Sequence, residues 1–119
     1  MKLTGPKFED NNIQYKRDKL SKYQFILSSL VSYELEYKMY DNARYNEPLD
    51  QLIKRKIIEL NNLRMDIEIA LSKLPIEYQT VLKLKYIDGK TFRQIGQTLH
   101  YCEHTISRYH NKGLQLIEL

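Results

Sequence analysis

Polar side chains that can make directional hydrogen bonds lie close together near the end of the chain. Arg108 carries a planar set of N–H donors that can bond both acceptors on a guanine edge. Glu103 can accept a hydrogen bond from a cytosine amino group, and Thr105 and Ser107 can contact either bases or phosphates. His104 lies among them in the sequence. This combination is suited to reading base edges in a groove of duplex DNA.

Basic side chains lie on both sides of this group in the sequence. Lys90, Arg93 and Lys112 are spaced so that they could contact the phosphates that flank a groove. Phosphate contacts position a protein on the duplex, whereas base contacts select the sequence. The candidate DNA-binding set is Lys90, Thr91, Arg93, Glu103, His104, Thr105, Ser107, Arg108 and Lys112.

The first element expected to position these residues is a helix over about residues 75–87. It begins after Leu74, because a residue that precedes proline avoids helical dihedral angles. It ends at Asp88–Gly89, where glycine suits a left-handed stop. Its apolar positions are Tyr78, Val81, Leu82 and Tyr86, with Leu84 beside them.

A short helix and a longer one follow, joined by a tight turn. Thr91 is a good N-cap for the short helix over residues 92–99, where Gly96 indicates a close contact, since glycine within a helix costs about 1 kcal/mol relative to alanine. After a turn at positions 100–101, the last helix begins at residue 102 or 103, with an inner face of Ile106, Tyr109, Gly113, Leu114 and Ile117. This order predicts a helix-turn-helix, whose second helix enters the major groove.

The same stretch resembles region 4 of bacterial sigma factors. The resemblance covers about 45 residues and is carried by Leu74–Pro75, Val81-Leu82-Lys83-Leu84-Lys85-Tyr86, Asp88-Gly89-Lys90-Thr91-Phe92-Arg93-Gln94-Ile95-Gly96, Leu99 and Thr105 to Leu114. It departs from the family pattern in two places, because Gly96 replaces the usual alanine and His100 replaces the usual turn glycine. The chain lacks the other sigma regions, so it should not act as a complete sigma factor.

The layout of the whole chain is similar to that of small sigma-region-4-like regulators of Gram-positive phages and mobile islands, which include the ArpU and RinA late-gene activators. The resemblance implies control of packaging and structural genes. It implies double-stranded DNA as the partner and leaves a contact with bacterial RNA polymerase open.

The N-terminal part is predicted to be a helical hairpin over residues 14–74, after a flexible tail over residues 1–13. An apolar stripe starts near Gln14 and predicts a helix that ends near Asp41–Asn42, before a loop over residues 42–47; its members are Tyr23, Ile26, Leu27, Leu30, Tyr33, Tyr37 and Tyr40. A second helix is expected from Pro48. It has a heptad-like repeat of Ile53, Leu60, Ile67 and Leu74, widened by Ile57, Leu63, Ala70 and Leu71.

One side of such a hairpin is apolar and has to be buried against another protein surface. A unit of this size buries too little surface to be stable alone, so this side should pack either on a second copy or on the C-terminal module. We expect a homodimer. The predicted fold is all-α, with this long hairpin followed by a three-helix module over residues 75–119.

Composition narrows the function classes further. The formal charge of +4 permits nucleic-acid binding without requiring it. The N-terminal residues do not resemble a secretory signal, and the single Cys102 gives no sign of an oxidising compartment, so a cytoplasmic protein is expected. The sequence shows no nucleophile–base pair, phosphate-binding glycine loop or pair of carboxylates placed for catalysis. Cys102 with His100, His104 and His110 matches no structural zinc pattern. We therefore expect neither an enzyme nor a cofactor or metal.

Two other functions remain open at this point. The hairpin could hold a polymerase subunit or host protein, with weak DNA binding by the module. A small terminase subunit also joins a helix-turn-helix to an oligomerising helical part, although the C-terminal place of the module and its sigma-like pattern count against that.

Overall fold

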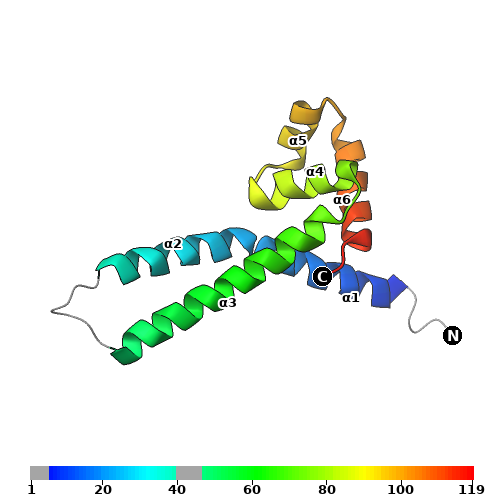
Figure 1. Ribbon diagram of the computed structural model, residues 1–119. Helices are drawn as coiled ribbons and strands as arrows, with labels where there is room; N and C mark the ends of the chain where they lie inside the picture. The colour runs from blue at the N-terminus through cyan, green and yellow to red at the C-terminus, as the bar shows by residue number, and fades with distance from the viewer. Residues whose placement is uncertain (1–5, 40–46) are drawn as a thin grey trace.

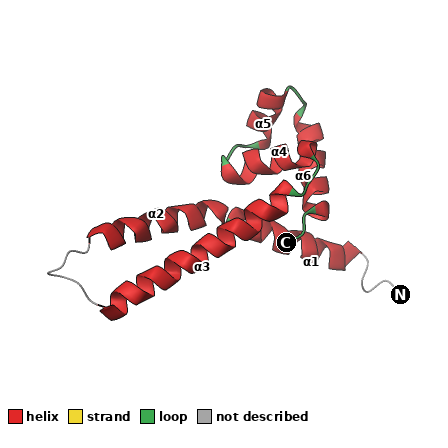
Figure 2. Ribbon diagram, in the orientation of Figure 1, coloured by secondary structure: helices red, strands yellow, loops and turns green. Residues whose placement is uncertain are grey.

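A computed structural model describes residues 6–39 and 47–119 (Figure 1). Within these residues the chain is helical and has no strand, which confirms the all-α prediction (Figure 2). The predicted end of the first helix at Asp41–Asn42 and nearly all of the predicted loop over residues 42–47 lie outside the described ranges. The elements are α1 (Pro6–Ser21), α2 (Tyr23–Met39), α3 (Glu47–Ser72), α4 (Ile76–Leu82), η1 (Lys83–Ile87), α5 (Phe92–Leu99) and α6 (Glu103–Leu116).

Helices α2 and α3 lie side by side as the two arms of the predicted hairpin (Figure 1). Tyr23, Ile26 and Leu30 of α2 are buried, and so are Ile53 and Ile67 of α3. The positions on α2 are three and four residues apart and those on α3 fourteen, which is two heptads, so each helix turns one apolar stripe toward the other. The hairpin follows most of the stripes seen in the sequence, but Tyr37 and Leu63 are exposed, and Tyr40 lies outside the described residues.

The N-terminal segment departs from the prediction. The chain was expected to be a tail as far as residue 13 and then one continuous helix, but α1 begins at Pro6 and ends at Ser21, and α2 starts at Tyr23. Proline suits a first helical turn because it has no N–H to leave unpaired. Ile13 packs against the core and Leu20 is fully buried within it, so tertiary packing stabilises a helix that has little local apolar pattern.

Helix α3 stops at Ser72, close to the break predicted at Leu74–Pro75. Pro75 lies just before α4 with extended backbone angles, and Ile76 is the first helical residue. Helix α4 then continues as the π-helical turn η1, in which the Asp88 N–H donates to the Lys83 carbonyl at 3.1 Å. The sequence predicted this stretch as one ordinary helix over about residues 75–87.

One hydrophobic core crosses the boundary at Leu74–Pro75. Its buried members come from α1, α2 and α3 and also from α4, η1 and the last part of the chain; they include Leu20, Tyr23, Leu71, Leu82, Tyr86, Leu114 and Ile117. A smaller core of Val81, Ile95 and Ile106 lies within the helix-turn-helix module. The hairpin therefore packs on the module, which was one of the two packing partners expected for its apolar side.

Candidate nucleic-acid interface

The frame of the interface is a short helix, a tight turn and a longer helix, as predicted. Thr91 caps α5: its hydroxyl accepts from the Gln94 N–H at 3.2 Å, and the Gln94 side chain accepts from the Thr91 N–H at 2.9 Å. Ile95 of α5 and Ile106 of α6 are fully buried against each other's helices. The reciprocal cap and the apolar contact hold the two helices in fixed relation.

The turn explains both departures from the family pattern. His100 adopts a left-handed conformation with φ 63° and ψ 39°, which costs a non-glycine residue roughly 1–2 kcal/mol. This turn brings Tyr101 back over α5, where its N–H donates to the Gly96 carbonyl at 3.0 Å. A Cβ atom on residue 96 would lie 2.6 Å from the Tyr101 carbonyl oxygen, so alanine does not fit here. The close approach inferred from Gly96 is real, and the turn backbone lies nearest.

Helix α6 carries the predicted base-reading residues on and around its N-terminal half. Its inner face is buried through Ile106, His110, Gly113 and Leu114. Glu103, His104, Arg108 and Lys112 are exposed, whereas Thr105 and Ser107 are half-buried. Arg108 lies opposite the centre of the buried face, and Ser107 lies beside that face. The geometry makes Arg108 the best placed of these residues to reach a base edge.

The predicted phosphate-contacting residues at α5 are positioned differently from one another. Arg93 is exposed in the first turn of α5. Thr91 is exposed, but its hydroxyl oxygen already serves as the helix cap. Lys90 is half-buried, and its N–H donates to the Leu84 carbonyl at 3.0 Å. The free N–H groups and positive end of a helix favour a phosphate near Thr91 and Arg93.

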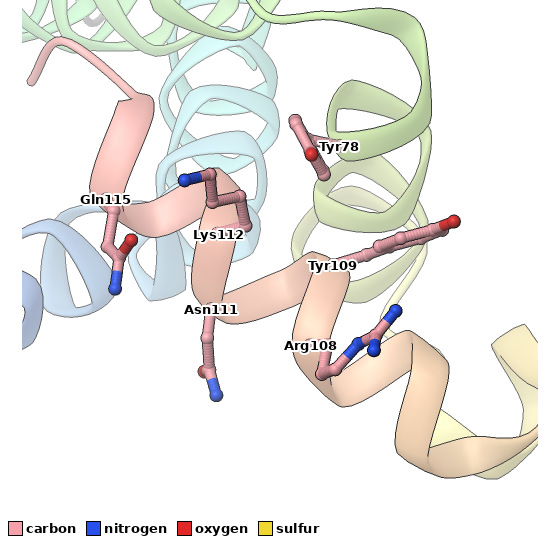
Figure 3. Close-up of a pocket in the computed structure, with 6 residues that line it drawn as sticks. All are labelled: Tyr78, Arg108, Tyr109, Asn111, Lys112 and Gln115. Carbon is pink, nitrogen blue, oxygen red and sulfur yellow. The ribbon is translucent and has the colours of Figure 1, made fainter.

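Sequence reasoning missed two residues on the outer face of α6. Asn111 and Gln115 are exposed, and they continue the line of His104 and Arg108 at steps of four, three and four. With Arg108, Lys112, Tyr78 and Tyr109 they line an open hollow of about 370 Å³ beside α4 and α6 (Figure 3). Asparagine and glutamine can bond the edge of adenine bidentately. The helical spacing in the sequence could have revealed them.

A buried histidine supports α6 from behind. His110 is 4% exposed, its Nε2 lies 2.6 Å from the Tyr86 hydroxyl, and its ring packs against Tyr86 and the edge of Phe92. Burial lowers the pKa of His110 to about 4, and the positive charges of Arg17 and Lys85 act in the same direction. The ring is therefore neutral near pH 7. Sequence reasoning had noted His110 only as a rejected zinc ligand.

Helix α1 holds the opposite end of α6. The buried Lys16 donates from Nζ to the Gln115 carbonyl at 3.2 Å. Burial raises the pKa of Tyr86, and the positive charge of the nearby Arg17 guanidinium opposes the rise. Figure 1 shows the end of α6 beside α1, away from α5. Two basic residues that could have been taken for a DNA-binding arm are therefore internal contacts.

Cys102 immediately precedes α6 and is exposed. Its Sγ lies 3.2 Å from the Thr105 hydroxyl, and hydrogen bonds from Thr105 lower the pKa of the thiol. Among residues 6–39 and 47–119, no three His, Cys, Asp or Glu side chains gather in a way that could hold a metal ion.

Fold and surface together define this part of the chain as a helix-turn-helix module. Residues 70–117 match the family model described as Sigma-70, region 4, and this range includes α4, α5 and α6. The match covers the C-terminal part of the chain, so it bears on the module and does not extend over α1, α2 or most of α3. Searches of curated proteins and of solved structures gave no match to the chain. No helix in the described ranges is long and apolar enough to cross a membrane.

Proposed function

We propose that this chain is a sequence-specific transcription regulator that reads the major groove of duplex DNA with α6. The observation that carries the proposal is the exposed line of His104, Arg108, Asn111 and Gln115 on a helix whose opposite face is fully buried. A helix held this way presents the same side chains in the same geometry at every encounter. The match of residues 70–117 to sigma-70 region 4 supports DNA as the ligand.

The side chains divide into two roles under this proposal. Arg108 bonds a guanine edge, Glu103 accepts from a cytosine amino group, and Asn111 is suited to adenine. Arg93 and Lys112 contact phosphates on either side of the groove, together with Lys90, Thr91 and the start of α5. His104, Thr105 and Ser107 complete the contact zone near the start of α6, where recognition helices approach base edges most closely.

The biological setting is also a proposal. The layout, a charged helical hairpin before a region-4-like module, supports an activator of phage or mobile-element packaging and structural genes that binds DNA as a homodimer. Such an activator acts by binding alone, without catalysis, and its module could also contact RNA polymerase.

The decisive experiment is binding-site selection in vitro with the purified chain, followed by footprinting on the selected site at physiological salt. Enrichment of one motif supports the proposal. Arg108→Ala should then weaken binding to that site by about 5- to 150-fold and relax the preference at one base pair, the effect of losing one base contact. Lys38→Ala, which removes a positive charge from the distant end of α2, serves as the matched control and should leave binding within twofold.

Two results would contradict the proposal. Selection that enriches no sequence, combined with capture of a polymerase subunit, would favour a protein-binding role for the chain. Assembly into a ring of more than two copies would favour a terminase-like role.

A further inference from the structure

We propose that a second copy of this chain docks on the outer face of α3, with the two α3 helices parallel. The inference rests on the homodimer of the proposed function and names the surface that forms it. Along α3, Ile58, Asn62, Met65 and Ile69 follow at intervals of four, three and four residues. This is the spacing of the a and d positions of a coiled coil.

The side chains of these four residues face away from the rest of the chain. Ile58 is 61% exposed, Met65 49% and Ile69 50%, and Asn62 is exposed between them. The opposite side of the same helix is buried against the rest of the molecule through Ile53, Ile67 and Leu71. A surface helix needs one apolar stripe to pack on its own domain. A second stripe on its far side indicates a second partner.

Asn62 indicates what that partner is. When it occupies an a position, the d positions are Ile58 and Met65, and a parallel copy places Asn62 opposite its own equivalent. The two side-chain amides can then bond each other, and a single buried asparagine of this kind specifies register and a two-stranded state. In an antiparallel pair, a positions face d positions, and Asn62 would lie against Met65 or Ile58 without a polar partner.

The charges beside the seam complement those of a parallel second copy. With Asn62 at a, the flanking g positions include Lys54 and Glu68, and the e positions five residues further on are Glu59 and Lys73. In a parallel pair, each g residue of one copy faces the e residue five positions later in the other copy. This pairs Lys54 with Glu59 and Glu68 with Lys73. Lys54 also contacts Asp50 at 3.1 Å and Lys73 contacts Glu118 at 3.8 Å within the chain. Each lysine ammonium has three donors and can bond both carboxylates.

The parallel arrangement has a consequence for DNA binding. Helix α3 leads directly into α4 through residues 73–75, so two parallel α3 helices bring both helix-turn-helix modules to the same end of the dimer. One duplex can then meet both α6 helices, and its site would consist of two related halves. An antiparallel pair would separate the modules by the length of α3, about 39 Å at 1.5 Å per residue.

The interface can be tested by sedimentation velocity on the full chain without DNA, over a range of concentrations. The wild type should reach twice the chain mass of 14.3 kDa. Ile58→Glu and Met65→Glu should each raise the dimer dissociation constant about 30-fold or more, as expected for a charge at the centre of a packed interface. Leu35→Glu is the matched control, since Leu35 is 57% exposed on α2 and should leave the dimer intact. Circular dichroism verifies that each variant is folded.

Orientation is tested with a cysteine near one end of the seam, where only a parallel pair brings the two copies of one residue together. Ile69→Cys in a Cys102→Ser background should form an interchain disulfide on mild oxidation, whereas Leu35→Cys in the same background should not. The charge-reversed variant Lys54→Glu should weaken the dimer, and adding Glu59→Lys should restore it.

A monomeric wild type at tens of micromolar concentration would overturn the proposal, and so would a dimer lost in Leu35→Glu but kept in Ile58→Glu. These outcomes are separable from failure of the proposed function. A dimer that selects no DNA sequence would contradict sequence-specific DNA binding alone, and a monomer that binds a selected site would contradict the homodimer and its α3 interface but leave DNA reading by α6 intact.

Discussion

The helix-turn-helix module and the hairpin differ in what their helices leave uncovered. In the module, the buried side chains of α5 and α6 pack on each other in a small apolar core. The outward positions of α6 are mostly polar. In the hairpin, both arms have apolar residues on their outer sides as well, such as Phe25 and Val31 on α2 and Ile58 on α3. The outer side of α6 is therefore suited to a polar ligand, whereas the hairpin presents apolar surface of the kind that packs on another protein chain.

The two regions nevertheless share one hydrophobic core, and a substitution in this core should have the largest effect on stability. Leu82→Ala removes a fully buried side chain that packs with Leu71 of α3 and Leu114 of α6. It should lower the free energy of unfolding by about 2–5 kcal/mol, and the chain should still unfold in one transition by urea titration. Leu52→Ala, at a position on α3 that is 50% exposed, should change that free energy by no more than about 0.5 kcal/mol. Two separate transitions in the wild type would show that the regions are independent.

Sensitivity to acid should belong to the module, because all three histidines lie in it and one is buried. The pKa of His110 falls to about 4 in the fold from a usual 6.5, so the unfolded chain binds the proton first. Stability is independent of this group above about pH 6.5 and falls as the pH drops from 6.5 toward 4, by about 2–3 kcal/mol.

The measurement is thermal or urea unfolding between pH 7 and 4.5, compared with His110→Gln, which can still bond the Tyr86 hydroxyl. The variant should lose much less stability over that range. Equal pH dependence in both proteins would remove His110 as the cause.

The tight approach of the turn to α5 should make residue 96 intolerant of any side chain. Gly96→Ala places Cβ 2.6 Å from the Tyr101 carbonyl oxygen, which is backbone and cannot move aside cheaply. We expect a loss of about 1–3 kcal/mol, together with weaker binding to the selected DNA site. Gln97→Ala, at the next position of the same helix and exposed, is the control and should be close to neutral. A stabilised Gly96→Ala protein would contradict the geometry of the turn.

The smallest effect is expected at the left-handed turn residue. His100→Gly relieves the cost of φ 63° but adds freedom to the unfolded chain, so a net gain of about 0.5–1 kcal/mol is expected. The same substitution at His104, within α6, should instead cost about 0.5 kcal/mol. Differential scanning calorimetry of the pair checks both signs, and a loss of stability in His100→Gly would show that the imidazole has a role that outweighs the strain.

Local chemistry in the sequence determined where the helices begin and end and which residues lie on much of the candidate interface. Pro75, Gly89 and Thr91 act on their own backbone or on neighbours within a few residues, so the starts and stops that they predict appear in the structure. The outward position of Arg108 likewise follows from the period of one helix.

The tertiary structure decided what depends on residues far apart in the chain. Helix α1 has little apolar pattern of its own, and Leu20 is buried because distant elements pack over it. Lys16 and Arg17 look like free cations in the sequence, but Lys16 donates to the Gln115 carbonyl and the charge of Arg17 acts on Tyr86. His110 is buried and His104 is exposed, because the face of α6 that carries His110 meets Tyr86 and Phe92. Helical period predicts which residues share a face, but the partners that each face meets are fixed only when the elements pack.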